Sequence, residues 1–421
     1  MKPRRPTFIV GGAHSPYIGK GHPDFVGREE REQGVASNPT IEDHIVTAVS
    51  GALASTTAEP EAVARAVERG YIGNFLGELF CQQGLLGAAV VAAHPDLDGK
   101  PFFRTEAACA SGGAAIVACI DAISAGHDVT LAVGAEVECT TSGREGAEYM
   151  ARACHYPTER ALDDFVFPYL FAVRARAYKQ AHGATEDDLH QVVLKAYDNA
   201  NRNPLAHMHS TRLTLDELQS SNNRVFLQDP ELRPHMQLYD CTHFSDGASA
   251  ILIASEEGLA RLGVDRSRCT QVLSHGSATA PLDGAKDPLE LSTMGRAAFE
   301  AFRDAGVRPG DMAVAELHDC FSIAELLVSE AIGLANPGGA LELIRSGATR
   351  RDGRIPVNTG GGLIGFGHPV GATGVKQVLE VHRQMRGLCG DYQIATTPEL
   401  GVSANLGGDD RTAVVMVQST V

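Results

Sequence analysis

The sequence lacks the marks of a membrane protein and of a nucleic-acid-binding protein. It contains no apolar run of the roughly 18 residues that a membrane-spanning helix needs. Basic residues are scarce, with 36 lysines and arginines against 52 aspartates and glutamates, and the formal net charge of -16 opposes binding to a phosphate backbone. We therefore expect no membrane span and no nucleic acid among the partners of this chain.

Paired cysteines and a signal peptide are missing as well. The nine cysteines are scattered and show neither the C-x-x-C spacing of zinc sites nor the framework of a small secreted protein. The amino-terminal stretch has a basic end, but only three apolar residues precede its first glycines, which is too few for a signal peptide. We expect reduced thiols and a cytoplasmic location.

What the sequence does contain is an alternation of strand-like and helix-like segments. Buried strands are expected at 7–12 and 129–136, and helices at 41–56 and 115–126. This alternation predicts an α/β protein. The length of 421 residues indicates two or three packed units.

The second half of the chain repeats features of the first. DGASAILIAS at 246–255 and DRTAVVMVQS at 410–419 both join an aspartate and small or polar residues to a buried strand, and CTQVLSHGSATAP at 269–281 is similar to the strand near the amino terminus. A duplicated α/β unit would explain both pairs. Any two buried strands also look alike, so these residues alone leave duplication open.

Residues 140–224 interrupt the pattern with a charge-rich excursion. Thr185 and Asp188 stand in capping-box spacing ahead of a helix with apolar residues on one face. We interpret this segment as an insertion in the first half. Its basic residues either meet an anionic ligand or lie on a solvated helix face; they are Arg174, Arg176, Lys179, Lys195, Arg202 and Arg212.

Cys109 stands among alanines and glycines in EAACASGGAA, just before a helical run. A cysteine at a helix start lies near unpaired backbone N–H groups and the positive end of the helix dipole, which lower a thiol pKa from about 8.5. Small neighbours also leave room for a substrate and for another backbone. Cys109 is either a reactive thiol of this kind or a buried core cysteine.

A second candidate, His368, lies in the glycine-rich stretch NTGGGLIGFGHPVGATG at 358–374. Pro369 fixes the backbone directly after it, and an amphipathic helix follows. The stretch lacks the G-K-[ST] ending of a phosphate-binding loop, so we reject that interpretation. A histidine on such a turn is placed where a ligand can reach it.

Two more segments complete the set of candidates. His318, Asp319 and Cys320 follow one another at a strand-to-helix junction in ELHDCFSIAELL, and SANLGGDD forms a glycine turn before the last strand. Histidine and cysteine in series could bind a metal, but no matching ligand pair stands at finger-like spacing, so we expect no metal site. We expect Asp319 to cap the helix that follows it.

Taken together, these four segments resemble the thiolase superfamily, from FIVGGAHSPY to TAVVMV. CASGGAA is similar to its nucleophile motif and GHPVGATG to its histidine motif. Where most members carry N-E-x-F and C-x-G, this chain has HDCF and NLG, so Asn405 stands in the place of the second catalytic cysteine. This combination resembles the sterol-carrier-protein-type thiolases and their acetyl-CoA acetyltransferase-like relatives.

The resemblance implies a duplicated five-layered α-β-α-β-α fold with an inserted loop domain. The implied units are an amino-terminal half at 1–139 and 225–266, a loop domain at 140–224 that covers coenzyme A, and a carboxyl-terminal half at 267–421. Coenzyme A and acyl-CoA would be substrates, with no permanently bound cofactor. A homodimer or homotetramer is implied as well.

The resemblance also implies a role for each candidate. Cys109 would take the acyl group from a thioester after His368 removes its proton. The N–H groups of Cys109 and Gly407 would hold the oxyanion of the acyl enzyme. Thr242 stands where family members contact the pantetheine arm.

A second set of roles concerns the other substrate. His318 stands in place of the motif asparagine, and with His368 it would hold the enolate oxygen of acetyl-CoA. Asn405 has no titratable proton, so Cys320 is the candidate acid/base for the α-proton, unless it is merely packed.

The predicted reaction is the cleavage or synthesis of a 3-oxoacyl-CoA through an S-acyl-cysteine. Two alternatives remain open. One is a ketoacyl-synthase-like condensing enzyme or a C-acyltransferase with a non-CoA acceptor. The other is a weakly active subunit that keeps the fold and binds partners.

Overall fold

The structure, a computed structural model, describes residues 1–220 and 227–421. Within these residues the strands form a nine-stranded sheet in the order β3-β2-β4-β5-β1-β6-β9-β8-β7. Their bounds are β1 (Phe8–His14), β2 (Arg69–Gly73), β3 (Phe102–Thr105), β4 (Val129–Glu136), β5 (Gly247–Ala254), β6 (Thr270–Thr279), β7 (Val314–Leu317), β8 (Leu400–Gly407) and β9 (Thr412–Thr420). The α/β class is confirmed.

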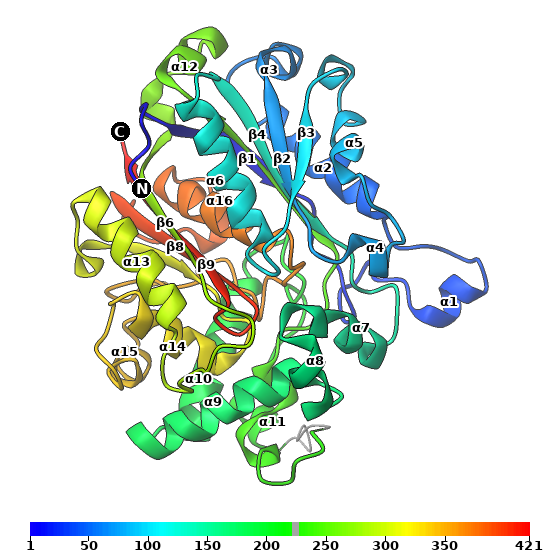
Figure 1. Cartoon of the computed structure of the whole chain (residues 1–421), viewed down its shortest axis with the longest axis vertical. Helices are drawn as coiled ribbons and strands as arrows, with labels where there is room; N and C mark the ends of the chain where they lie inside the picture. Colours follow the sequence, from blue (N-terminus) through cyan, green and yellow to red (C-terminus); the bar gives the residue numbers. More distant parts are fainter. Residues whose placement is uncertain (221–226) are drawn as a thin grey trace.

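Helices connect these strands and cover both faces of the sheet (Figure 1). They are α1 (Arg28–Glu32), α2 (Ile41–Leu53), α3 (Pro60–Ala66), α4 (Gly77–Phe80), α5 (Leu86–Val91), α6 (Ser111–Ser124), α7 (Gly143–Met150), α8 (Tyr156–Glu159), α9 (Val166–His182), α10 (Glu186–Ala200), α11 (Leu215–Ser220), α12 (Glu256–Leu262), α13 (Ser292–Ala305), α14 (Ser322–Ala331), α15 (Ala340–Arg345) and α16 (Thr373–Met385). The strands and helices expected at 7–12, 41–56, 115–126 and 129–136 correspond to β1, α2, α6 and β4.

The strand pairing repeats between the two halves. β1 is antiparallel to β5 as β6 is to β9, and β4 is antiparallel to β5 as β8 is to β9. β2 runs parallel to β4 as β7 does to β8. Two unrelated buried strands would not reproduce this whole set of neighbours, so the duplication that the sequence left open is confirmed.

The two halves meet at the centre of the molecule. β1 pairs with β6 only through Phe8 with Gln271 and Ile9 with Thr270, which joins the two half-sheets into one. α6 and α16 pack against each other between the half-sheets, while α2 and α13 cover the outer faces (Figure 1). This gives the five layers that the family resemblance implied.

Glycines let α6 and α16 approach each other closely. A Cβ atom on Gly112 would lie 2.7 Å from the carbonyl oxygen of Gly371, and one on Gly374 would overlap the backbone nitrogen of Gly113. Two helix starts therefore touch backbone to backbone. The small residues after Cys109 serve this contact, which holds the Cys109 turn against the His368 loop.

Replacing Gly374 with alanine should lower the free energy of unfolding by about 1–3 kcal/mol, because the added methyl group has no room between the two helices. Urea unfolding monitored by circular dichroism measures this change. Gly310→Ala is the matched control, since a Cβ atom there meets nothing within 4 Å. Equal stability of the two variants would contradict the packing argument.

The helices from α7 to α11 lie in the chain between β4 and β5 and group together in Figure 1. The capping box predicted at Thr185 and Asp188 is confirmed at the start of α10. The predicted domain boundary between 224 and 225 lies outside the described residues. In the described part of the chain, no helix combines the length and the hydropathy needed to cross a bilayer.

Candidate active site

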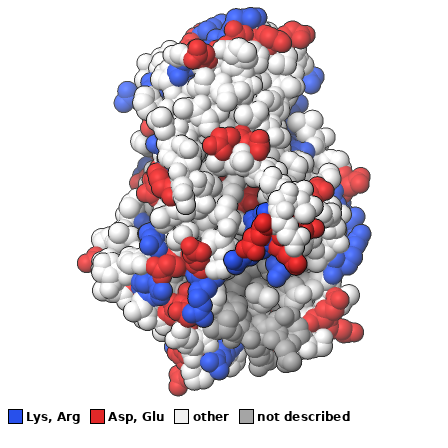
Figure 2. Space-filling model, turned by 90° about the vertical axis from the view of Figure 1, so that its right-hand side faces the viewer, with Lys and Arg blue, Asp and Glu red and all other residues white. Residues whose placement is uncertain are grey.

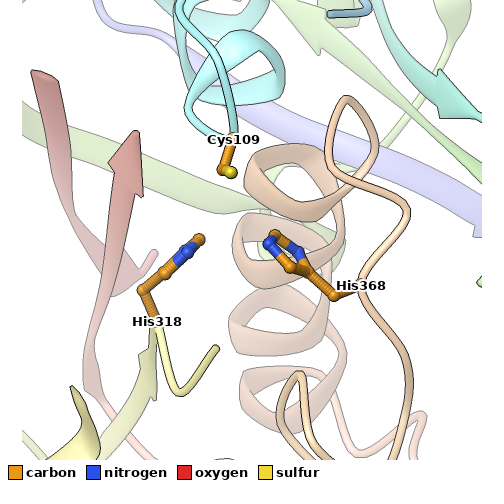
Figure 3. Close-up of side chains that lie close together, drawn as sticks. All are labelled: Cys109, His318 and His368. Carbon is orange, nitrogen blue, oxygen red and sulfur yellow. The ribbon is translucent and has the colours of Figure 1, made fainter. Parts of the chain in front are cut away.

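Cys109 lies on a tight turn directly before α6. Ala108 has a φ of 49°, in the left-handed region that non-glycine residues rarely occupy. Ser111, the first residue of α6, stabilises the turn: its hydroxyl donates to the carbonyl of Ala108 at 2.6 Å and accepts from the N–H of Ala107 at 2.9 Å. The turn directs the thiol toward the two histidines (Figure 3).

His368 is oriented by the first turn of α16. Its Nδ1 lies 2.6 Å from the hydroxyl oxygen of Thr373, and that hydroxyl donates in turn to the carbonyl of Pro369 at 3.2 Å. With the hydroxyl proton used there, we assign Nδ1 of His368 as the donor in the first bond. This places the proton on Nδ1 and leaves a lone pair on Nε2, which can accept a proton.

His318 follows β7 and is oriented by Asn405. The amide nitrogen of Asn405 donates to the carbonyl of Cys109 at 3.1 Å and lies 3.3 Å from Nδ1 of His318. An amide nitrogen only donates, so Nδ1 of His318 accepts and the proton resides on Nε2. The two imidazoles therefore carry opposite tautomers: His368 offers an acceptor and His318 offers a donor.

The three side chains form one cluster at the junction of the two halves (Figure 3). The sulfur of Cys109 and a ring nitrogen from each histidine lie within 4.8 Å of one another. The imidazole rings of His318 and His368 are 5.0 Å apart and meet edge to face. A thiolate with two imidazoles could also hold a zinc ion, although the sequence led us to expect no metal.

The pKa of the Cys109 thiol is raised, contrary to our expectation from its position before a helix. Burial raises it to about 12, and the hydrogen bond from the backbone N–H of Gly408 offsets only part of this. Desolvation of the thiolate outweighs the helix terminus. Burial and the charge of Lys376 lower the pKa of His368 to about 3, so its imidazole is neutral at neutral pH.

The resting cluster is therefore a neutral thiol beside a neutral imidazole. We expect the rate of iodoacetamide alkylation at Cys109 to rise about tenfold per pH unit from pH 7 to 10 without a plateau, because the thiolate fraction keeps growing below a pKa of about 12. Peptide mass spectrometry after quenching measures this rate, and Cys109→Ala gives the background. A plateau below pH 7 would instead indicate a thiolate–imidazolium pair.

Cys320 and Thr242 line the same cavity as Cys109 and both histidines. The backbone N–H of Thr242 donates to the carbonyl of Cys320 at 3.1 Å, which ties the two segments together. Burial, followed by the nearby Cys109 and Asp319, raises the pKa of the Cys320 thiol well above its usual value. Cys320 is thus a protonated thiol in the same cavity as the Cys109 sulfur.

The glycine turn after β8 reaches the cluster through Gly408. Gly408 lines the cavity with a φ of 64°, and its N–H is the group that hydrogen-bonds the Cys109 sulfur. Gly407 is the last residue of β8 and packs against the carbonyl of Ala107. Its predicted role as an oxyanion donor stays a prediction.

Asp319 does not cap the next helix, which corrects our expectation. α14 begins at Ser322 after Phe321, with no side-chain cap. The carboxylate of Asp319 instead accepts from the N–H of Leu363 at 2.6 Å. Asp319 therefore fixes the glycine-rich loop that leads to His368.

Two basic residues of the inserted segment are neither on a solvated face nor free for a ligand. Arg174 is 2% exposed and its Nε lies 2.6 Å from Asp409, next to Gly408. Lys195 is buried against Glu325. Both pairs join the insertion to the carboxyl-terminal half.

Sequence reasoning missed the residues that act through backbone contacts. Glu138 lines the cavity, and its two carboxylate oxygens accept from the N–H groups of Val370 and Ser245 at 2.9 and 3.4 Å. Thr373 and the amide of Asn405 set the two tautomers. Thr373 belongs to the quoted GHPVGATG motif, whereas no sequence pattern marks Glu138.

Comparison with known families gives matches to both halves of the chain. Residues 28–257 match the thiolase amino-terminal domain, and residues 274–420 match a family described as thiolase C-terminal domain-like. Together these matches cover both the Cys109 turn and the His368 loop.

Individual relatives span most of this chain. The acetyl-CoA acetyltransferase of Methanothermobacter thermautotrophicus is 35% identical over 350 residues, which are 83% of this chain and 88% of the relative. The benzoylsuccinyl-CoA thiolase subunit BbsB of Thauera aromatica is 29% identical, over 82% and 85% of the two chains. The Ltp2-ChsH2(DUF35) aldolase structure superposes with a TM-score of 0.76 at 19% identity, over 100% of this chain and 99% of that one. This chain belongs to the thiolase family of acyltransferases.

Proposed function

We propose that this chain cleaves or makes a 3-oxoacyl-CoA through an S-acyl intermediate on Cys109. One observation carries the proposal: the Cys109 sulfur and a ring nitrogen from each of two imidazoles lie within 4.8 Å of one another. The hydrogen bonds of the two rings assign them opposite tautomers, one able to accept a proton and the other able to donate. Acyl transfer by a thiol whose pKa is high needs such a base, because little thiolate exists at rest.

In the cleavage direction, Nε2 of His368 takes the thiol proton as the Cys109 sulfur attacks the C3 carbonyl. The C2–C3 bond then breaks, and its electron pair leaves as the enolate of acetyl-CoA. The Nε2–H of His318 and the new N–H of the His368 imidazolium can both hydrogen-bond the enolate oxygen. The backbone N–H groups of Cys109 and Gly407 serve the carbonyl of the acyl enzyme.

The Cys320 thiol would give the proton that C2 of the enolate takes up. The incoming CoA thiol returns a proton to Cys320 and attacks the acyl enzyme, and the imidazolium of His368 returns its proton to Cys109. Each group is thereby restored. The synthetic direction runs through the same steps in reverse.

Intact mass spectrometry after brief incubation with acyl-CoA substrates tests the proposal. We expect one acyl group, mapped to Cys109, and its removal by free coenzyme A. Thiolysis of acetoacetyl-CoA, followed by the loss of its magnesium-enolate absorbance, separates this reaction from a condensation with a non-CoA acceptor. If no acyl group forms on Cys109 with any acyl-CoA, a partner-binding subunit becomes the better description.

Replacing Cys320 with alanine should lower thiolysis about 10²–10⁴-fold, the range of a lost general acid or base. The acyl enzyme should still form from a simple acyl-CoA, because Cys109 and His368 are intact. Comparing steady-state thiolysis with acylation by intact mass makes this distinction. A parallel loss of both activities would show that Cys320 holds the site together instead of moving a proton.

Thr242 is proposed to contact the pantetheine arm, since it lines the cavity beside Cys320. The helices α7 to α11 are proposed to cover coenzyme A. If the Thr242→Val variant has the same KM for coenzyme A as the wild type, the proposed contact of Thr242 with the pantetheine arm is wrong.

A homodimer or homotetramer is proposed from the free edge of the sheet. β3 ends the strand order, and beside it Phe103 and Leu85 are 52% and 82% exposed. Below the charged rim at its top, the upper part of the face in Figure 2, where Figure 1 places β3 and α5, is mostly free of charged side chains. An open strand edge with apolar side chains is suited to pairing with a second copy. Sedimentation of a Phe103→Lys variant tests this assembly.

A cytoplasmic location is proposed from the thiols. All nine cysteines are free thiols. Seven of them are buried, and Cys81 and Cys109 are half-buried. Free thiols in this number suit a reducing compartment.

A further inference from the structure

The cavity at Cys109 is much larger than an acetyl group requires. Its volume is about 400 Å³. An apolar cavity of about 150 Å³ already holds a benzene molecule. The end of a pantetheine arm would share this space with the acyl group.

Few polar side chains line this cavity, and most belong to the Cys109 cluster. Glu138 accepts two backbone N–H bonds, and the Nδ1 atoms of His318 and His368 are each held by a hydrogen bond, which leaves their Nε2 atoms for the thioester. Outside that cluster Thr242 and His243 are the polar partners for an acyl group, so burying a charged one would be unfavourable.

Aromatic rings from three separate segments line the rest of the cavity. Phe165 and Phe167 come from the start of α9, Phe244 precedes β5, and Phe321 follows Cys320 directly in the chain. The rings of Phe171 and Phe321 are stacked, with centroids 4.4 Å apart and planes inclined by 21°.

The rings of this stack are the more deeply buried part of the aromatic lining. Phe171 and Phe321 are buried, whereas Phe165, Phe167 and Phe244 are half-buried. Aromatic rings gain from stacked and edge contacts with another ring beyond the burial of area alone. A flat ring also loses less rotational freedom on binding than a linear chain of equal carbon number.

We propose that the acyl group carried by Cys109 is apolar and bears a ring, of about phenylacetyl size, and that acetyl is a poor acyl donor to this sulfur. The inference rests on the proposed function and adds the substrate class. The thioester exchange itself is unchanged: the S–acyl bond to Cys109 forms, the bond to the coenzyme A sulfur breaks, and the cysteine proton passes through His368 to the coenzyme A thiolate.

The test compares the rate of Cys109 acylation by acetyl-CoA, octanoyl-CoA and phenylacetyl-CoA, measured by quenched-flow intact mass at equal subsaturating concentrations. Each buried methylene is worth about fourfold in binding, so a ring that fills the cavity should give at least about a hundredfold advantage over acetyl. We expect phenylacetyl-CoA to be the fastest, followed by octanoyl-CoA and acetyl-CoA.

Each other outcome has a separate meaning. Acetyl-CoA at an equal or higher rate overturns the inference while the proposed function stands. Octanoyl-CoA ahead of phenylacetyl-CoA overturns the preference for a ring. No acyl group on Cys109 from any of the three overturns the proposed function itself.

Substitutions of two cavity-lining phenylalanines test the ring preference independently of the wild-type rates. Phe167→Leu and Phe244→Leu keep apolar volume but remove a ring, and each should lower the phenylacetyl-to-octanoyl rate ratio about threefold to tenfold. Phe299→Leu, at a residue of α13 that is 67% exposed, is the control and should leave the ratio unchanged. A ratio unmoved by both cavity variants overturns the assignment of these rings.

Discussion

Replacing Cys109 with alanine should lower kcat/KM for thiolysis by at least about 10⁴-fold, because no other group in the cluster can carry the acyl chain. His318 and His368 would remain and could still hydrogen-bond the carbonyl oxygen of the substrate. These bonds hold the substrate, but without the Cys109 sulfur no S-acyl intermediate forms. Steady-state thiolysis and the mass of the acylated protein measure the two effects separately.

A matched control for this variant is Cys119→Ala. Cys119 lies ten residues further along, inside α6, and is fully buried without lining the cavity. Its replacement should cost some stability but little activity. If Cys109→Ala kept more than a tenth of the wild-type rate, the covalent route would be wrong even with the fold intact.

The fold could be predicted to a large extent because its signals are local or family-wide. Buried strands such as β4 and β5 are continuous apolar runs, and the capping box at Thr185 needs only residues three apart. The order of the Cys109 and His368 motifs identified the family. The repeat was visible in two strand pairs but became certain only from the pairing of β1 with β5 and β6 with β9.

The protonation of the site could not be predicted from the sequence. The tautomer of His318 depends on Asn405, 87 residues away in the chain, and the pKa of Cys109 depends on how deeply the turn is buried. We expected a lowered thiol pKa because a helix start was visible while desolvation was not. The magnitude of desolvation for a buried thiolate decides the sign.

Buried ion pairs were missed for a similar reason. A lysine or arginine in a helical segment is typical of a solvated face, and only the tertiary structure brings Arg174 to Asp409, 235 residues further on. Asp319 was likewise assigned to the nearest helix, although its partner is the N–H of Leu363. Short-range rules place a polar residue with its neighbours in sequence, and this site is built from contacts between the two halves.

The buried pair of Lys376 and Glu316 illustrates how such a contact supports the site. Nζ of Lys376 lies 2.8 Å from the Glu316 carboxylate and 3.3 Å from the carbonyl of Gly362, and it stands 4.9 Å from the centre of the Phe366 ring. The two charged side chains are 0% and 1% exposed. Through the bond of Lys376 to the Gly362 carbonyl, the pair therefore holds the loop that precedes His368.

Replacing Lys376 with methionine should lower the free energy of unfolding by about 3–5 kcal/mol, because the buried Glu316 carboxyl loses its partner and must either stay charged in the interior or take up a proton. One oxygen of Glu316 already has no hydrogen-bond partner within the described residues, and the other accepts from Nζ of Lys376. The double variant Lys376→Met with Glu316→Leu removes both charges, and it should recover most of the loss. Urea unfolding of both single variants and the double variant gives the coupling energy. A double variant no more stable than Lys376→Met would show that the lysine acts through its contacts with Gly362 and Phe366, and that pairing with Glu316 contributes little.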